Sequence, residues 1–213
     1  MAAQVTAGRV DRRQAILDAA LTTFARDGFV ATSMDDVAEA AGVAKPTVYN
    51  HFGDKTALFL AALAHGSATA NERVLTTIAD MSATPDDLRA ELERLGFALV
   101  GCLSGGAASA MRLQLMEATR FPDEIAAVRD GNRRRTIDAL AGKLAQLAAT
   151  GRLRISDPLR ASRQFMALVT DEPLVASGFG AAGVAPAVIE ASVTEGVDTF
   201  LAAFSSGGAG LSR

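Results

Sequence analysis

The 213-residue sequence has a single cysteine, Cys102, and only two histidines, His51 and His65. One cysteine excludes an internal disulfide framework and a cysteine-based zinc site. The two histidines stand 14 residues apart without neighbouring cysteines, so the HExxH and Cys/His zinc patterns both fail. The GxSxG, Walker A and EF-hand patterns are missing as well. We therefore predict a protein without a metal, without a cofactor and without a hydrolytic centre.

Long apolar runs are also lacking. A membrane-spanning helix needs about 20 apolar residues, and the uncharged stretch Leu95–Met111 is shorter and contains serine and glycine. The sequence does not open with the basic, apolar and small-residue regions of a secretory signal. Hydrophobic residues nevertheless make up 49% of the chain, which is enough to build a core and excludes intrinsic disorder. These features predict a soluble, cytoplasmic protein.

The pattern that the sequence does contain is helical. Apolar residues recur every three or four positions through most of the chain, whereas the alternation typical of strands is confined to Arg152–Ile155, which we expect to be a linker turn. Four prolines stand where helices are expected to begin. The later helices are predicted near Pro85–Leu103, Gly106–Arg120, Pro122–Thr150, Asp157–Ser177 and Pro186–Phe204.

Two short predicted helices follow the apolar stripe that begins at Ile16. The first, Ser33–Ala41, opens with Ser33-Met34-Asp35-Asp36, in which the hydroxyl and the Asp36 carboxylate form a capping box. Gly42 closes it, and the second helix runs from Lys45 to Phe52. Two short helices joined by a glycine-containing turn form a helix-turn-helix. We predict an all-α chain of about nine helices: a three-helix helix-turn-helix domain (1–56), a larger helical domain (57–205) and a flexible tail (206–213).

The second short helix has the division of side chains that a DNA-reading helix requires. Val48 and Phe52 form an apolar back, while the remaining side chains are mostly polar. The chain has three lysines, and two of them, Lys45 and Lys55, bracket this helix. The net charge of this segment gives no support to DNA binding, because residues 1–56 hold six Lys/Arg against seven Asp/Glu. An ordinary solvated surface helix is the alternative interpretation.

The run from Arg13 onward, which includes TSMDDVAEAAGVAKPTVYNHFGDKTALF, resembles the DNA-binding domain of the TetR family of repressors. The resemblance implies a homodimer whose paired helices enter successive major grooves of a near-palindromic double-stranded operator. By position, Lys45, Pro46 and Thr47 would approach base edges. The chain departs from the family at Ala44, where a serine usually caps the helix. The other candidate DNA-contacting residues are Thr32, Ser33, Tyr49, Asn50, His51 and Lys55, of which Thr32, Tyr49, His51 and Lys55 would meet phosphates.

The C-terminal part, including MEATRFPDEIAAV, a break at Gly131-Asn132 and LAQLAATGRLRISDPLRASRQFMALV, resembles the AefR-like group of TetR C-terminal domains. This resemblance implies an inducer-binding domain and a ligand-responsive repressor. Flexible methionines and helix-interrupting glycines favour a small, mostly apolar ligand. We expect the last two long helices to form the dimer interface. The candidate ligand-binding residues are Phe97, Cys102, Met111, Met116, Phe165 and Met166, although helical spacing favours plain core for each of them taken singly.

Other functions stay open on the sequence alone. Residues 178–183 match GxGxxG, but they follow a helical pattern interrupted by Pro173 rather than a strand, so a helix–helix loop is preferred over a dinucleotide site. The chain can also be an all-α enzyme or metabolite-binding module whose first helices merely resemble a DNA reader. A helical interaction protein that binds neither DNA nor a ligand is the third possibility.

Overall fold

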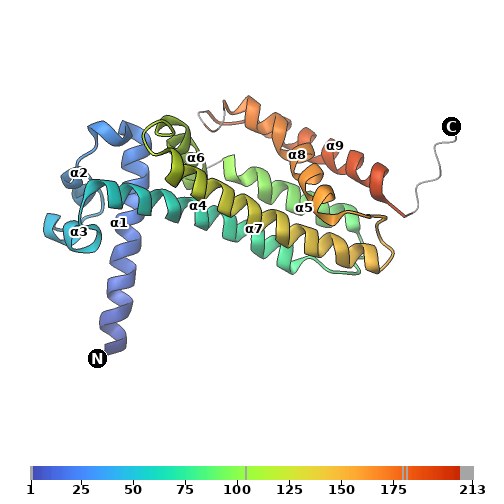
Figure 1. Ribbon diagram of the computed structural model, residues 1–213, viewed down its shortest axis with the longest axis horizontal. Coiled ribbons are helices and arrows are strands. Elements are labelled where there is room, and N and C mark those ends of the chain that lie inside the picture. Colours follow the sequence, from blue (N-terminus) through green and yellow to red (C-terminus); the bar gives the residue numbers. More distant parts are fainter. Residues whose placement is uncertain (1, 104, 179, 181, 207–213) are drawn as a thin grey trace. The chain divides into compact units, whose positions relative to one another are not determined.

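A computed structural model describes residues 2–103, 105–178, 180 and 182–206, except the side chains of residues 2–11, 102 and 105. The described chain is all-α, as predicted (Figure 1). None of its helices combines the length and apolar content needed to cross a membrane. The elements are α1 (Ala2–Ala31), α2 (Met34–Ala40), α3 (Lys45–Phe52), α4 (Lys55–Asp80), α5 (Leu88–Val100), the 3-10 turn η1 (Gly101–Leu103), α6 (Gly105–Met116), α7 (Pro122–Ala149), α8 (Pro158–Ala176) and α9 (Pro186–Phe204).

One predicted helix start is wrong, and the break noted at Gly131-Asn132 does not interrupt its helix. Pro85 does not open α5, because the side chain of Asp87 caps that helix by accepting from the Ala90 N–H at 3.0 Å. Gly131 does not break α7, which continues through it. The segment around Leu153 links α7 to α8 as expected, and it also forms an isolated bridge in which the Arg154 N–H donates to the Phe204 carbonyl at 2.7 Å.

Pro173 does not interrupt α8, contrary to the expectation from sequence. A proline inside a helix removes the hydrogen bond to the carbonyl four residues earlier, here that of Val169. The hydroxyl of Ser192 on α9 donates to that carbonyl at 3.3 Å. A side chain from the neighbouring helix therefore satisfies the acceptor that the proline leaves free, and α8 continues to Ala176.

The chain forms two compact units. The first comprises Met1–Ala70 and Ser104–Arg129, and the second comprises Asn71–Leu103 and Asp130–Arg213. α4 is continuous through residue 56, where the sequence places a domain boundary, so the compact units divide within this helix rather than at its start. Residues 207–213 of the expected tail lie outside the described residues.

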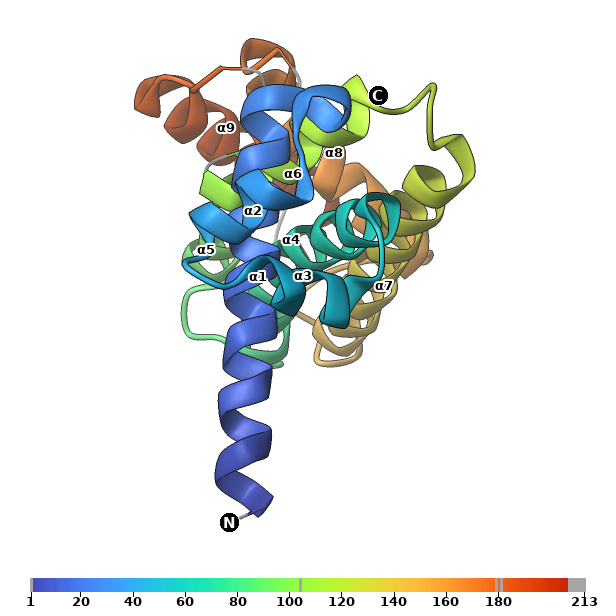
Figure 2. The same ribbon diagram turned by 90° about the vertical axis from the view of Figure 1, so that its left-hand side faces the viewer.

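The core of the first unit is built around phenylalanines. Phe24 and Phe59 are fully buried, with ring centroids 5.2 Å apart, and Phe121 lies 5.0 Å from Phe59 and 5.1 Å from Phe29. The short helices contribute to the same core with Met34, Val37 and Val48. α2 therefore lies against α1, and α3 against α2 (Figure 2).

In the second unit, α8 and α9 approach closely, and α5 packs against both. A Cβ atom at Gly196 of α9 would come within 2.8 Å of the Leu168 carbonyl oxygen of α8. Phe165 and Phe200 are fully buried beside this crossing, with ring centroids 5.1 Å apart. At Gly96 of α5, a Cβ would lie 2.8 Å from Val193, so this glycine permits close packing where we expected irregular packing.

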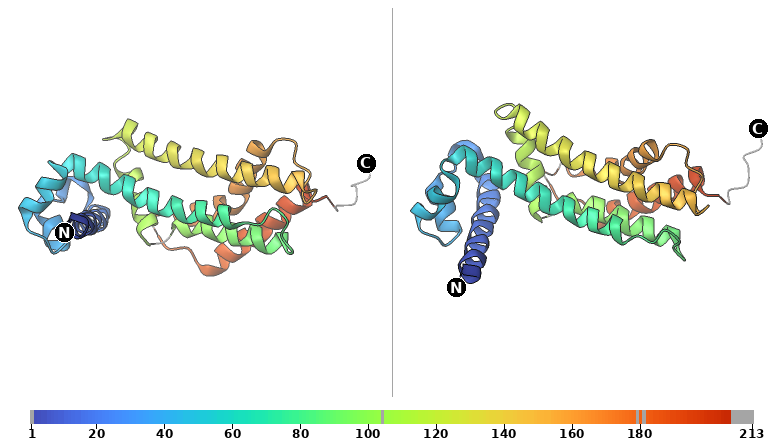
Figure 3. Two further views of the ribbon diagram at one scale, coloured as in Figure 1. Left: turned by 90° about the horizontal axis from the view of Figure 1, so that it is seen from below. Right: turned by 60° about the horizontal axis from the view of Figure 1, so that its bottom comes forward.

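α7 from Asp130 onward and the C-terminal part of α4 also belong to the second unit, and they run side by side in the same direction (Figure 3). The Lys143 ammonium donates to the Met81 carbonyl at 2.6 Å, just beyond the end of α4. Nearer the start of this contact, the Thr136 hydroxyl donates to the Asn71 side chain at 2.6 Å. Polar contacts therefore join these two helices at both ends of the shared stretch.

Substituting alanine for two helical glycines should change stability in opposite directions. Gly196→Ala should lower the free energy of unfolding by about 1–3 kcal/mol, because its Cβ meets α8 backbone that cannot rotate away. Gly142→Ala should raise it by about 0.5–1 kcal/mol, because Gly142 is exposed in α7 with open space around it. Urea unfolding measures both values. Equal effects of the two substitutions would contradict the close approach of α8 and α9.

Candidate nucleic-acid interface

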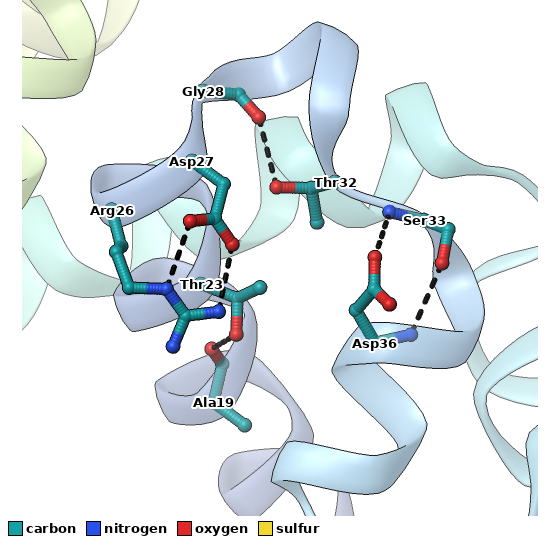
Figure 4. A network of polar contacts seen from close by, with 8 residues as sticks. All are labelled: Ala19, Thr23, Arg26, Asp27, Gly28, Thr32, Ser33 and Asp36. Atoms are coloured by element: carbon teal, nitrogen blue, oxygen red, sulfur yellow. Dashed lines mark hydrogen bonds and ion pairs between the residues drawn. The ribbon is translucent and has the colours of Figure 1, made fainter.

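The connection from α1 to α2 sets the direction in which the short helices leave the core. Gly28, with φ 80° and ψ 169°, departs from helical geometry inside α1, in a region that favours glycine. The Thr32 hydroxyl donates to the Gly28 carbonyl at 2.8 Å (Figure 4). This bond satisfies an acceptor at the end of α1 immediately before the chain turns into α2.

The predicted capping box at Ser33 is confirmed. The Ser33 N–H donates to the Asp36 carboxylate at 2.7 Å, and the Asp36 N–H donates to the Ser33 hydroxyl at 3.1 Å (Figure 4). Two interactions with Ser33 lower the pKa of Asp36. The hydrogen bond from the Ser33 N–H has the larger effect, and that with the Ser33 hydroxyl has the smaller one. The ionised cap therefore stabilises the folded chain above the ordinary pKa of an aspartate, and this contribution is lost as the pH falls through the lowered pKa of Asp36. At neutral pH the cap is ionised and intact.

α3 is positioned by two glycines and a proline. Gly42, with φ 64°, follows the end of α2, and Gly53, with φ 79°, follows the end of α3. Pro46 stands in the first turn, where the missing N–H costs nothing. Ala44 occupies the N-cap position and makes no side-chain cap hydrogen bond, as expected from the missing serine. The fully buried Val48 anchors the helix to the core.

The polar face of α3 is largely solvent-exposed. Pro46, Asn50 and Tyr49 are exposed, while Thr47 and His51 are half-buried. The exposed Lys45 ammonium donates to the Asp35 carboxylate at 2.8 Å, which raises the pKa of Lys45. The structure therefore brings most of the candidate DNA-contacting side chains together on one short helix.

Two of the candidate DNA-contacting residues, Thr32 and Lys55, donate hydrogen bonds to backbone carbonyls of the protein itself. Thr32 is only 1% exposed, so its side chain holds the end of α1 and is not presented to solvent. Lys55 is half-buried and donates to the Val30 carbonyl at 3.1 Å, with its ammonium 4.7 Å from the centre of the Phe29 ring. Both residues border the interface and also support the helices that form it.

The candidate ligand-binding residues are divided between the two compact units. Met111 and Met116 belong to the first unit, whereas Phe97, Phe165 and Met166 belong to the second. Phe165 is fully buried, but Phe97 is 44% exposed and Met116 is 51% exposed. The side chain of Cys102 lies outside the described residues. The ligand site stays a prediction.

The buried polar residues that sequence analysis did not identify include Asn71, Glu117 and Thr136. Each stands on an apolar helical stripe, three or four residues from a buried aliphatic residue such as Val74, Leu113 or Leu140. A polar residue at such a position is the signal that would have identified them.

Two residues of the GxGxxG match at 178–183, 179 and 181, lie outside the described residues. Among the others, the Gly180 N–H donates to the Ser177 hydroxyl, just beyond the end of α8, at 2.9 Å. A dinucleotide site of this type requires a preceding strand. A helix precedes it here, so the match lacks the structural context that its chemistry needs.

Family models match most of the chain. Residues 16–62 match the model of bacterial regulatory proteins of the tetR family, and residues 90–206 match that of the C-terminal domain of AefR-like transcriptional repressors. The first match contains α2 and α3, and the second covers more than half of the chain.

Individual proteins show the same likeness. The transcriptional activator FasR of Mycolicibacterium smegmatis is 46% identical over 55 residues, which are 26% of this chain and 25% of FasR. A protein from Mesorhizobium loti has the same fold, with a TM-score of 0.83 at 22% identity over 92% of this chain and 98% of its own. The flavonoid-responsive regulator FrrA gives a TM-score of 0.65 at 28% identity over 92% of this chain and 97% of its own.

The matches to FasR and the other curated relatives span about a quarter of each relative's length. The AefR-like model extends the likeness to residues 90–206. With both models matched in order along one all-α chain, the protein belongs to the tetR family of bacterial regulatory proteins and has an AefR-like C-terminal domain.

Proposed function

We propose that the chain is a transcriptional repressor that binds a near-palindromic double-stranded operator as a homodimer in the cytoplasm. The observation that carries the proposal is the exposed polar face of α3, on a helix whose apolar back is anchored by Val48. A short helix held in this way can enter a major groove and offer its side chains to base edges. The matched tetR-family model over residues 16–62 supports the same reading.

Individual charges carry the attraction to DNA in this proposal. Lys45 lies at the N-terminal end of α3, and Arg13 lies with its guanidinium 5.3 Å from the centre of the Phe52 ring at the other end. Cations beside phosphates release counterions on binding, which makes affinity dependent on salt even where the domain has no net positive charge. Lys45, Pro46 and Thr47 are the proposed base-reading residues, and Tyr49, Asn50 and His51 complete the proposed surface.

We also propose that a small, mostly apolar molecule releases the protein from DNA. Support comes from the AefR-like repressor model over residues 90–206 and from the likeness to FrrA, whose name describes it as flavonoid-responsive. FasR is named an activator, so an experiment must distinguish repression from activation. A reporter gene placed under the operator makes that distinction. Loss of the protein should raise expression of a repressed reporter and lower that of an activated one.

For the dimer we propose the exposed apolar edge of α8, next to α9. Leu168 and Val175 stand seven residues, or about two helical turns, apart on one face of α8, and they are 38% and 59% exposed. Large aliphatic side chains exposed along one helix are typical of a face that a second copy covers. A two-fold dimer through this edge would present two copies of α3 to half-sites about 34 Å apart.

Operator binding should fall steeply with salt, and two substitutions should separate base contacts from phosphate contacts. Thr47→Ala should change the order of preference among operator variants, because it alters a base-edge contact. Tyr49→Phe should weaken binding to all variants about equally, because it removes only a phenolic donor to phosphate. A selection from random DNA followed by titration at two salt concentrations measures both. A chain that binds no selected DNA would instead favour an all-α enzyme or metabolite-binding module.

Asp35→Asn should raise affinity for DNA about two- to fivefold at low salt, because the substitution frees Lys45 from its ion pair. Glu39→Gln is the matched control, since it removes an exposed carboxylate from the same helix α2. Titration of the operator at low and high salt measures the gain, which should shrink as salt rises. Equal gains from the two substitutions would show that only net charge matters and that Lys45 makes no specific contact.

Leu168→Glu combined with Val175→Glu should convert the dimer to a monomer at micromolar concentration, because two carboxylates would then face the partner's apolar edge. Leu115→Glu is the control, since Leu115 is 54% exposed on α6, a helix that does not belong to the proposed interface. Light scattering after size-exclusion chromatography measures the mass. A wild-type chain that is monomeric throughout would contradict the proposed dimer.

A further inference from the structure

Asn71 places a side-chain amide inside the second unit. The residue is 7% exposed, and its Oδ1 accepts from the hydroxyl of Thr136, which is 3% exposed, at 2.6 Å. Its Nδ2 has no hydrogen-bond partner. Among the described side chains, one other buried nitrogen lacks a hydrogen-bond partner, the Nε of Arg112. Buried polar atoms in folded proteins are almost always paired, so the Asn71 amide calls for an explanation.

Turning the amide over does not remove the problem. An asparagine side chain offers two N–H donors and a carbonyl acceptor, and the hydroxyl of Thr136 can serve one of these atoms. With nitrogen and oxygen exchanged, the oxygen would be the atom without a partner. In either orientation one buried atom of the Asn71 amide is left for a group that the folded chain does not supply.

Asn71 is not needed to hold α4 to α7. One residue later on α4 and one residue earlier on α7, the Glu72 carboxylate and the Arg135 guanidinium form an exposed ion pair at 3.0 Å. Lys143 and the Met81 carbonyl join the same two segments at 2.6 Å. An aliphatic residue at position 71, together with valine at position 136, would continue the buried stripe of Val74 and Ile78 and leave neither side chain unpaired. Stability alone therefore does not account for asparagine here.

We propose that the side-chain amide of Asn71 is the hydrogen-bonding contact for the inducer, and that the inducer is a mostly apolar molecule carrying a carbonyl acceptor. The inference rests on the proposed release of DNA by a small ligand and names the chemistry of that ligand. Its apolar character follows from the neighbours of the amide, because Val74 and Leu140, one turn further along α4 and α7, are buried aliphatic residues. A carbonyl oxygen supplies the acceptor that Nδ2 lacks.

Matched pairs of probes isolate the carbonyl. Benzophenone with diphenylmethane, and 2-acetylnaphthalene with 2-ethylnaphthalene, keep the aromatic rings constant and differ in the carbonyl acceptor. For at least one pair, the full-length wild-type protein should bind the carbonyl compound about tenfold more tightly than its hydrocarbon partner, measured by titration calorimetry. Asn71→Leu should reduce that preference to within about twofold. Combined with Thr136→Val, which removes the hydroxyl that Asn71→Leu would leave unpaired, it should also leave the melting temperature equal or higher.

Two further variants make the result specific. Arg135→Leu removes the neighbouring exposed ion pair and should keep the wild-type preference for the carbonyl. Asn71→Ala replaces Asn71→Leu if the latter does not fold, with the same expected loss of preference. A preference that survives removal of Asn71 would overturn the proposal and assign the free amide atom to a buried water. Absence of any carbonyl preference in the wild-type protein would overturn it too.

Operator affinity, measured with the same probes, separates this inference from the function on which it rests. A carbonyl compound that binds through Asn71 and weakens operator binding supports both. A carbonyl compound that binds through Asn71 and leaves operator affinity unchanged supports the contact and contradicts the proposed release of DNA. Release of DNA by carbonyl and hydrocarbon probes alike, at equal concentrations, supports the repressor and contradicts the role of Asn71.

Discussion

The first unit depends on one buried carboxylate. Gly28 ends the regular part of α1, so the N–H of Phe29 needs an acceptor from elsewhere. Glu117, which is 8% exposed and follows α6, accepts that N–H at 3.0 Å with one oxygen and the Arg120 guanidinium at 3.2 Å with the other. The residue that fixes the start of the short helices is therefore held by a side chain 88 positions away in the sequence.

The phenylalanine cluster makes this hydrogen bond effective. Phe29 lies between the fully buried Phe59 and the half-buried Phe121, with ring centroids 5.2 Å and 5.1 Å away. The charged groups of Lys55 and Arg120 lie 4.7 Å and 5.4 Å from the centre of the Phe29 ring. Cations over an aromatic ring are stabilised by its π-electrons. Phe29 thus joins the end of α1, the start of α4 and the turn after α6, and α2 and α3 are built on that junction.

Features set by local chemistry could be predicted from the sequence, and those set by distant partners could not. The Ser33 box, Gly42 and Pro46 each act within one helical turn, and each lies where predicted. Pro173 was misread because the donor that rescues α8, Ser192, lies on α9. Thr32 was expected to face DNA, but the geometry around Gly28 buries it. The polar face of α3 could be predicted, whereas the pairing of Lys45 with Asp35 required the fold.

Buried polar residues divide into two groups that the sequence cannot distinguish. Asn71 and Glu117 both interrupt apolar stripes, and both are at least nine-tenths buried. Glu117 has partners on both carboxylate oxygens, so its polarity is accounted for by the fold. Asn71 keeps an amide nitrogen without a partner, so the fold accounts for only part of its polarity. Periodicity locates such residues, but only the completeness of their hydrogen bonding separates a structural role from a group kept for a ligand.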